Sequence, residues 1–579
     1  MKGQVPSDLK KEVGVRYNVH NRISEYRTMK KRMICLSLCM LCLFPAALVR
    51  AAGVRVDVFL LGGQSNMAGR GAVSELPDAS VLSNENVMLY HSSSMSSGQP
   101  ANQWTTLRPA SSASGYFGPE IGFGNRIAEL YPDRRIALIK HAVGGTDIGA
   151  DWNPGAYPGD TSHFGPQYAT FVQTVNSGIA SLIAQGYDPV IRGMLWQQGE
   201  RDARDVAYGP VYGRNLSHFI RRVRAQFDAP NMPFIYGQVL PVELSAYTYR
   251  DDVRQGQLDV DEDSGHVSAT DGARFVPADD LPMNSDNLHV GAAGQMELGI
   301  RFAEATETVV VASAVDFNAD GFVDAEDVGL MFDHWRQGDP AYDVAPPPFG
   351  DGIVDFQDLL VVSVHLFFEI PPVDLIAWWR FDETDGGIAY NTIGKFDGVL
   401  NGEPQWQPDD GVNGGALSFD GTDDYLRTPF VIDPALDSFS VFAWIKGGAP
   451  GQVILSQEGG ANWLMADSTD GALRTDLKEA EVTGRNASPA GPPLISTTVI
   501  TDGHWHRIGF VRDANDRILY VDGVEVARDT AADLESCEVG LTIGAGNTLE
   551  PGSFFSGLID DVRIHDKALS AEEIDALGQ

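Results

Sequence analysis

Ser65 lies where a serine side chain could act as a nucleophile. The stretch Val54–Leu61 is largely apolar and β-branched and contains neither Gly nor Pro, which is typical of a buried parallel strand. Gly62-Gly63 ends this stretch, and Ser65 follows within Gly63-Gln64-Ser65-Asn66-Met67. A serine just past the carboxyl end of a first strand, on a turn that glycine permits, is accessible to a ligand. The same short pattern also fits a strand-to-helix turn with Ser65 as a helix cap, so other motifs must decide.

An aspartate and a histidine much later in the chain could complete the machinery for acyl transfer. Asp286 and His289 lie three residues apart in Ser285-Asp286-Asn287-Leu288-His289. His289 would take the proton of Ser65 and return it to the leaving alcohol. Asp286 would accept the imidazole N–H, fix the tautomer and steady the imidazolium. By itself, Asp-x-x-His is more typical of a surface turn and helix cap.

Acyl transfer also needs hydrogen-bond donors for the developing oxyanion. The candidates are the backbone N–H of Ser65, the backbone N–H of Gly144 or Gly145, and the side-chain amide of Gln198. Glycine suits the second position because the backbone must approach the substrate closely. A plain turn at Gly144-Gly145 and a polar loop at Gln198-Gly199-Glu200 are the alternatives.

Three further residues compete for these roles. Glu200 is the rival carboxylate, or a partner that fixes nearby loops, and His141 and His266 are rival bases. His141 ends a predicted buried strand, which favours a core histidine. His266 lies in a polar loop without a surrounding motif.

The elements that must position these groups alternate between strand and helix. Strands are predicted over Arg135–His141, Pro189–Trp196 and Pro233–Leu240, and helices over Tyr208–Phe227 and Ala292–Thr306. This alternation predicts an α/β domain over residues 53–312 with a parallel sheet and helices on both faces. The motifs fall in loops that follow strands, where such sheets bind their ligands. Their joint occurrence favours a catalytic site.

The Gly-x-Ser-x-Gly elbow of α/β-hydrolases is absent, so these motifs do not match that fold. Together they instead resemble the SGNH hydrolase superfamily. More narrowly they resemble its carbohydrate-esterase branch of acetylxylan esterases and sialate O-acetylesterases, over about residues 54–305. The resemblance rests on Gly63–Met67, Ala142–Thr146 with Trp152, Trp196–Glu200 and Asp286–His289.

This resemblance implies a three-layer α/β fold and removal of O-acetyl groups from sugars, with no metal in the chemistry. Ser65, Asp286 and His289 would form the triad, and Ser65, Gly144 or Gly145, and Gln198 the oxyanion hole. Gln64, Asn66 and Glu200 would support them. Gln-Gly-Glu stands where many members of the wider superfamily have an Asn block, which leaves the side-chain donor open.

Composition and the first residues indicate an exported protein. The chain has 579 residues, a net charge of −37 and a pI of about 4.5, which disfavours nucleic acid and anionic membranes as partners. Lys30-Lys31-Arg32, the apolar run Met33–Val49 and Val49-Arg50-Ala51 are typical of a signal peptide, predicted within residues 1–52. The run is short for a membrane anchor, the alternative. We therefore expect secretion, extracellular or periplasmic.

Cysteine usage predicts no disulfide framework. Cys35, Cys39 and Cys42 lie in the apolar run, and Cys537 stands alone far from them.

Residues 313–370 contain an EF-hand-type calcium loop. Its oxygen ligands would come from Asp316, Asn318, Asp320, the Phe322 carbonyl, Asp324 and Asp327, with Gly321 at the sharp turn. Asp at the last position resembles dockerin modules, which implies a small α-helical segment and a possible cohesin-like partner; a calcium-stiffened spacer is the alternative. A second copy over Pro347–Asp358 lacks the ligands at positions 1 and 3, so we expect weak calcium binding there unless Asp343 reaches in.

Residues 373–579 predict an all-β sandwich. Short alternating runs with turn signals follow Pro371-Pro372, and Asp522-Gly523 is a hairpin turn. Motifs such as Gly415–Gly421 and Ile559–Ile564 resemble laminin-G-like, concanavalin-A-type jelly rolls. That resemblance implies glycan binding or packing beside an enzyme, and possible calcium binding with Asp382 or Asp560.

The sequence thus predicts a secreted, multidomain carbohydrate O-acetylesterase, with an acetylated glycan as substrate. Two alternatives stay open: a glycan-binding or scaffold protein without activity, and a lipid esterase of the same superfamily. Acetate release from acetylated esters separates the first alternative from the enzyme.

Overall fold

The computed structural model describes residues 54–578 apart from 94–99, 158–159, 267, 320, 373, 394–395, 436–437, 482–489 and 538. The predicted signal peptide, Cys35, Cys39, Cys42 and Asp320 therefore lie outside the described residues. In the described part, no helix is both long and apolar enough to cross a bilayer.

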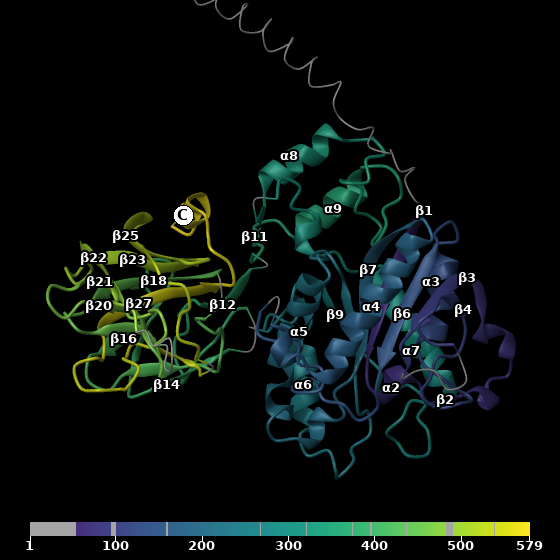
Figure 1. The fold of residues 1–579 in the computed structure, drawn as a ribbon. Helices are drawn as coiled ribbons and strands as arrows, with labels where there is room; N and C mark the ends of the chain where they lie inside the picture. The colour runs from purple at the N-terminus through teal and green to yellow at the C-terminus, as the bar shows by residue number, and fades with distance from the viewer. Residues whose placement is uncertain are drawn as a thin grey trace, which may run out of the picture. The chain divides into compact units, whose positions relative to one another are not determined.

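The first domain is a three-layer α/β fold around a seven-stranded sheet with the order β4-β3-β6-β1-β7-β8-β9 (Figure 1). The strand β1 lies at the centre, and the chain builds the sheet outward on both sides of it. This makes the carboxyl end of β1 a topological switch point, where ligands bind in open α/β sheets. The sheet strands are β1 (Val54–Gly63), β3 (Asn84–His91), β4 (Thr105–Leu107), β6 (Ile136–Ala142), β7 (Tyr187–Gln197), β8 (Phe234–Gly237) and β9 (Ala273–Val276).

The alternation of apolar side chains in β1 explains the two helical layers. Val58 and Leu60 pack with α4, α5 and α6, whereas Phe59 and Leu61 pack with α3 and α7. The helices are α2 (Ser65–Ala68), α3 (Glu120–Leu130), α4 (Pro166–Ala184), α5 (Tyr212–Gln226), α6 (Arg250–Val260) and α7 (Ala292–Thr306), and β2 (Gly71–Ala72) pairs with β5 (Tyr116–Phe117). Both faces of the sheet are therefore covered, as near-continuous apolar strands require.

The predicted strands and helices of this domain are present, with shifts at their ends. The helix predicted over Tyr208–Phe227 begins at Tyr212, after a short 3-10 turn at Gly209–Val211. The strands β3, β4 and β9 were not predicted from the sequence, and β4 runs antiparallel to β3, so the sheet is parallel except at that edge. The edge strands β4 and β9 have only three and four residues, too few for an apolar pattern, and β3 begins with the polar residues Asn84, Glu85 and Asn86.

Residues 313–370 contain two short helices, each preceded by an acidic loop: α8 (Ala325–Asp333) and α9 (Phe356–Val364). Each helix begins with a capping box, formed by Asp324 with Asp327 and by Asp355 with Asp358. A short ladder joins β10 (Phe322–Val323) to β11 (Phe368–Glu369).

The last domain is an all-β sandwich of two eight-stranded antiparallel sheets. Its core contains Trp379 and Trp463, whereas Trp444 and Trp505 are only partly buried. The strands are β12 (Leu375–Trp379), β13 (Ile388–Ala389), β14 (Gly398–Asn401), β15 (Gln405–Gln407), β16 (Ala416–Asp420), β17 (Tyr425–Arg427), β18 (Ser438–Gly447), β19 (Val453–Gln457), β20 (Asn462–Ala466), β21 (Ala472–Thr475), β22 (Leu494–Val499), β23 (Trp505–Asp513), β24 (Asp516–Val521), β25 (Val524–Thr530), β26 (Leu541–Ile543) and β27 (Ser556–His565), followed by the helix α10 (Ala571–Ala576).

Candidate active site

Ser65 begins the single turn α2 directly after the central strand β1. Gly63 has φ +139°, and a Cβ atom there would lie 2.2 Å from the Gln197 carbonyl oxygen, so only glycine fits. This close approach lets the chain turn sharply and leaves Ser65 with 6% of its surface exposed.

His289 and Asp286 meet Ser65 across more than two hundred residues of chain. The Ser65 Oγ lies 3.1 Å from His289 Nε2, and His289 Nδ1 lies 2.6 Å from Asp286 Oδ2. The three predicted residues therefore form one continuous hydrogen-bonded chain.

The turn around Asp286 fixes the direction of its carboxylate. Its Oδ1 accepts the backbone N–H groups of Leu288 (3.0 Å) and His289 (2.9 Å). Burial raises the pKa of Asp286, but these bonds and that from the imidazole outweigh it and hold the pKa below its usual value. An ionised carboxylate only accepts, so His289 carries its proton on Nδ1 and presents Nε2 as the acceptor for the Ser65 hydroxyl.

Gly144 is the better placed of the two glycines for an oxyanion hole. A Cβ atom on Gly144 would lie 3.4 Å from the Ser65 Cβ, whereas one on Gly145, with φ +75°, would have no neighbour within 4 Å. The Gly144 backbone therefore lies against the nucleophile, and Gly145 allows the turn that follows.

Gln198 does not fit its predicted role as an oxyanion donor. Its Nε2 donates to the Thr146 carbonyl oxygen (2.9 Å) and to Asp202 Oδ2 (2.5 Å), and the side chain is fully buried. The amide hydrogens are thus used inside the fold. Gln198 instead ties the loop after β7 to the loop after β6, which carries Gly144.

Asp202 is part of the same connection and was not singled out from the sequence. Both of its carboxylate oxygens accept the Ile148 N–H, at 3.1 and 3.2 Å. Burial raises the pKa of Asp202 to about 8. Its place four residues after Gln198 was the available signal, although one acidic residue in a polar loop points to no particular partner.

Asn66 and Glu200 support the histidine loop, as expected for partners of the site. Asn66 Nδ2 donates to Glu200 Oε1 (2.5 Å) and to the Leu288 carbonyl oxygen (3.2 Å), and Asn66 Oδ1 accepts the Val290 N–H (2.9 Å). Asn66 therefore holds the backbone on both sides of His289. Gln64 accepts the Arg201 N–H (3.2 Å) and so joins the same region.

Glu200 does not orient His289 directly, since Asp286 occupies that position. Its side chain is buried, which raises its pKa despite the bond from Asn66 and the nearby His289. Its contribution to the site passes through Asn66.

A buried ion pair lies behind the nucleophile and was also missed. Lys140 Nζ contacts Glu120 Oε2 at 2.6 Å, with both side chains fully buried, and donates to the carbonyl oxygens of Ala110 (2.8 Å) and Ala68 (3.4 Å). Ala68 ends α2, so the pair braces the turn that carries Ser65. A lysine inside an apolar strand gives no sign from sequence of the carboxylate that it meets.

The rival bases are placed elsewhere. His141 is buried, with Nδ1 at 2.7 Å from Ser92 Oγ and Nε2 at 3.3 Å from Gln167 Oε1. His266 is exposed and accepts the Ser268 N–H within its own loop. The interpretation of His141 as a core histidine agrees with this burial.

The first acidic loop has the expected arrangement for an oxygen-ligand site. Asp316 accepts the Gly321 N–H (3.0 Å), and Asp327 accepts the N–H groups of Phe317 (2.7 Å) and Asp324 (2.8 Å). Gly321 has φ +90°, as a sharp turn at that position needs. Asn318 and the Phe322 carbonyl belong to the same loop, and the donor set is chemically suited to calcium.

The second loop departs from its predicted register. Asp343 accepts the N–H groups of Asp351 (3.0 Å) and Gly352 (2.7 Å), as Asp316 does for Gly321, and Asp358 accepts those of Val344 and Ala345. Asp343 therefore takes position 1, and the loop 343–358 is four residues longer than 316–327. The register predicted over Pro347–Asp358 was wrong at position 1, because the insertion moves that residue upstream, and the alternative that Asp343 reaches into the loop is confirmed.

In the jelly-roll domain, Asp382 and Asp560 hold a loop. Asp382 accepts the Gly415 N–H (2.8 Å), and Asp560 accepts the N–H groups of Val412 (2.7 Å) and Asn413 (3.1 Å). Calcium in this domain stays a prediction.

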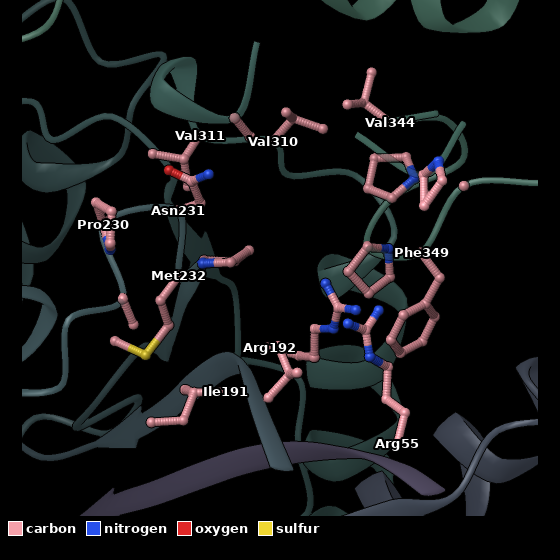
Figure 2. A pocket seen from close by; sticks show the side chains of 18 of the residues that line it. Arg55, Ile191, Arg192, Pro230, Asn231, Met232, Val310, Val311, Val344 and Phe349 are labelled. Carbon is pink, nitrogen blue, oxygen red and sulfur yellow. The ribbon is translucent and has the colours of Figure 1, made fainter. Parts of the chain in front are cut away.

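A separate cavity has a volume of about 1180 Å³. Figure 2 shows side chains that line it, among them Arg192 and Phe349. Its lining includes Arg55, Ile191, Arg192 and Phe349 and contains none of the three triad residues. Phe349 comes from the insertion in the second acidic loop, and its ring contacts the Arg134 guanidinium at 4.4 Å.

Comparison with known proteins shows what the first domain is similar to. Residues 55–308 match the family of carbohydrate esterases described as sialic acid-specific acetylesterases. Ser65, Asp286 and His289 and their supporting loops lie inside the matched residues. Residues 420–575 match the concanavalin A-like lectin/glucanases superfamily.

Individual relatives and solved structures resemble parts of the chain. A probable carbohydrate esterase from Arabidopsis thaliana is 28% identical over 268 residues, which cover 43% of this chain and 89% of that protein. A crystal structure of a protein from Arabidopsis thaliana is 25% identical, with a TM-score of 0.34, and covers 43% of this chain and 96% of its own. Domain 4 of an extracellular arabinanase from Geobacillus stearothermophilus, in complex with arabinotriose, is 23% identical, with a TM-score of 0.26, and covers 36% and 98% of the two chains.

The family match and the curated relative support an esterase that acts on carbohydrates.

Proposed function

We propose that the esterase domain removes O-acetyl groups from glycans through an acyl-enzyme on Ser65. The observation that carries this proposal is the continuous chain from Ser65 Oγ to His289 (3.1 Å) and from His289 to Asp286 (2.6 Å). The carbohydrate esterase family matched by residues 55–308 supports an ester of a sugar as the substrate.

In the first half of the reaction, His289 Nε2 takes the Ser65 hydroxyl proton while Oγ attacks the acetyl carbonyl carbon. The carbonyl oxygen gains the negative charge and accepts the backbone N–H groups of Ser65 and Gly144. The imidazolium, steadied by Asp286, then protonates the sugar oxygen. The C–O bond to the sugar breaks, and the acetyl group remains on Ser65.

In the second half, water takes the place of the sugar alcohol. His289 removes a proton from this water, which attacks the acetyl carbon of the acyl-enzyme. The bond to Ser65 Oγ breaks, His289 returns the proton to Oγ, and acetate leaves. This chain's own residues account for each proton transfer.

Secretion and glycan contact by the jelly-roll domain belong to the same proposal. The apolar run at residues 33–49 supports export, and the concanavalin A-like match over residues 420–575 supports a domain that contacts carbohydrate. A cohesin-like partner for residues 313–370 rests on the acidic loops alone.

A labelling experiment combined with acetate release tests the enzyme. The wild-type chain should hydrolyse 4-nitrophenyl acetate and release acetate from at least one of acetylated xylan, acetylated pectin and O-acetylated sialic acid. A fluorophosphonate probe should block this activity and modify Ser65, as mass spectrometry of the digested protein would show. Turnover with Ser65 unmodified would contradict the mechanism, and no turnover of any acetyl ester would favour a glycan-binding protein.

We also propose that the loop 316–327 binds Ca²⁺ through Asp316, Asn318, Asp320, the Phe322 carbonyl, Asp324 and Asp327. The bound ion would hold α8 in place and take no part in ester hydrolysis. Calorimetric titration with CaCl₂ should show binding that Asp316→Ala weakens at least tenfold. Hydrolysis of 4-nitrophenyl acetate should stay within about twofold in EDTA, and loss of activity in a chelated, folded protein would contradict this assignment.

A further inference from the structure

Arg70 lies beside the nucleophile, on the segment that follows α2. The point that a Cβ atom on Gly144 would occupy is 3.4 Å from Ser65 Cβ and 3.7 Å from Arg70 Nη2. The Arg70 guanidinium and the Ser65 side chain therefore flank the same exposed glycine. Both side chains therefore border the backbone at which the acetyl carbonyl oxygen is proposed to bind.

The backbone around Arg70 is fixed from two sides. Asn284 Nδ2 donates to the Arg70 carbonyl oxygen (3.0 Å), and Ser111 Oγ donates to the Gly69 carbonyl oxygen (3.0 Å). Asn284 in turn donates its N–H to the His289 carbonyl oxygen at 2.7 Å. The Arg70 backbone is thus held in a fixed position relative to the loop that carries His289. This preorganisation lowers the entropic cost of binding a ligand.

Within the described residues, the Arg70 guanidinium has no carboxylate at ion-pair distance. Its recorded polar contact is a weak one, from Nη1 to Ser112 Oγ at 3.4 Å. Other arginines of the domain do have such partners: Arg192 with Asp57, Arg254 with Asp279, and Arg301 with Asp280. In a chain with a net charge of −37, a partly buried arginine without a carboxylate partner at a reactive serine needs an explanation.

We infer that Arg70 binds a carboxylate on the sugar that carries the acetyl ester, so that the preferred substrates are acidic sugars. This inference rests on the proposed function. A guanidinium presents paired N–H donors that match a carboxylate in one plane, and this geometry both binds the sugar and orients its ester. Sialic acids and uronic acids both supply such a group.

The test compares substrates that differ only in the carboxylate. The first pair is the methyl glycoside of 9-O-acetyl-N-acetylneuraminic acid and its methyl ester at the carboxylate. The second pair is an acetylated oligogalacturonide and its methyl-esterified form. Acetylated xylo-oligosaccharide and 4-nitrophenyl acetate serve as neutral substrates. The variants are Arg70→Gln, Arg70→Lys and, as a remote charge control, Arg126→Gln, whose side chain pairs with Glu129 and Glu304.

We expect Arg70→Gln to lower kcat/KM about tenfold to a hundredfold on at least one carboxylate substrate, mainly through KM. On the neutral substrates, kcat/KM of Arg70→Gln should differ from wild type by less than about twofold. In the wild type, kcat/KM should be lower on each methyl ester than on the corresponding acid. Arg70→Lys should recover part of the activity that Arg70→Gln loses on the acid. Arg126→Gln should behave as wild type. The pair that responds identifies the source of the carboxylate.

Two results would overturn the inference while leaving the esterase intact. In one, Arg70→Gln lowers kcat equally on charged and neutral esters, which would assign Arg70 to the reacting oxygen or to folding. In the other, the wild-type enzyme hydrolyses each acid and its methyl ester equally well. Failure of the proposed function itself would appear separately, as absence of 4-nitrophenyl acetate turnover by the wild-type chain.

Discussion

Two serine–histidine pairs lie near the carboxyl end of the same sheet, and they differ in their surroundings. Ser65 meets His289 at 3.1 Å, and Ser92 meets His141 at 2.7 Å. The second pair is the shorter, yet both of its side chains are at most 2% exposed. A short hydroxyl–imidazole distance is therefore not sufficient to define a catalytic site.

The groups beyond each pair account for the difference. His289 is oriented by an ionised carboxylate, and an exposed glycine backbone lies beside Ser65. The far side of His141 faces the Gln167 amide, which cannot stabilise an imidazolium as a carboxylate does, and burial lowers the pKa of His141 to about 4. The buried pair thus satisfies two polar groups in the core, and the accessible pair is built to gain and lose a proton.

Exchanging each serine for alanine should give the largest contrast. Ser65→Ala should lower kcat on 4-nitrophenyl acetate by at least about a thousandfold, because the nucleophile is lost. Ser92→Ala should keep kcat within about twofold and destabilise the fold by about 1–2 kcal/mol, since buried His141 loses a partner. Kinetics and urea unfolding of both variants measure the two effects. A comparable loss of kcat in Ser92→Ala would remove the distinction between the pairs.

Changing the group behind each imidazole should have the next largest effect. Asp286→Asn should lower kcat by about a hundredfold to ten-thousandfold, because the amide can favour the wrong tautomer of His289. Gln167→Ala should leave kcat nearly unchanged. The matched measurement is steady-state hydrolysis of 4-nitrophenyl acetate at pH 7.5. Full activity in Asp286→Asn would assign the orienting function to another carboxylate, with Glu200 as the first candidate.

Acidification should destabilise the fold through the buried pair Ser92–His141. The pKa of His141 is about 4 in the fold against 6.5 for an ordinary histidine, so the unfolded chain binds the proton more readily in this interval. The contribution of His141 to the free energy of unfolding is therefore fully present above pH 6.5. It falls by about 3 kcal/mol as the pH drops toward 4. His141→Gln should flatten that part of the curve, measured by urea unfolding from pH 7 to pH 4. His91, whose pKa burial also lowers, remains in the variant, so a smaller slope should persist. An unchanged slope would contradict the burial of His141.

Much of this site follows from local patterns. Ser65 is marked by an apolar strand and two glycines, and Asp286 and His289 lie close enough in sequence to be recognised as a pair. Their convergence follows from one rule, that the carboxyl ends of parallel strands share an edge. The strands β1, β6 and β7 were long and apolar enough to predict.

Other features depend on contacts that sequence spacing does not encode. Gln198 was expected to face the substrate, and only the fold shows Asp202 drawing its amide inward. Arg70 and Lys140 gave no local signal, because the meaning of each charge depends on residues far along the chain. The register of the second acidic loop was missed because an insertion separates Asp343 from the residues that it contacts.

The exposure of Asp286 affects how the enzyme should respond to ionic strength. Its side chain is 48% exposed, so dissolved ions can screen its charge. The hydrogen bonds that orient the carboxylate toward His289 should persist in concentrated salt. The carboxylate then acts chiefly by direction, and hydrolysis of an uncharged ester should continue in concentrated salt. The proposed attraction between Arg70 and an acidic sugar is a charge interaction that salt screens. High salt would therefore reduce the difference in kcat/KM between acidic and neutral substrates.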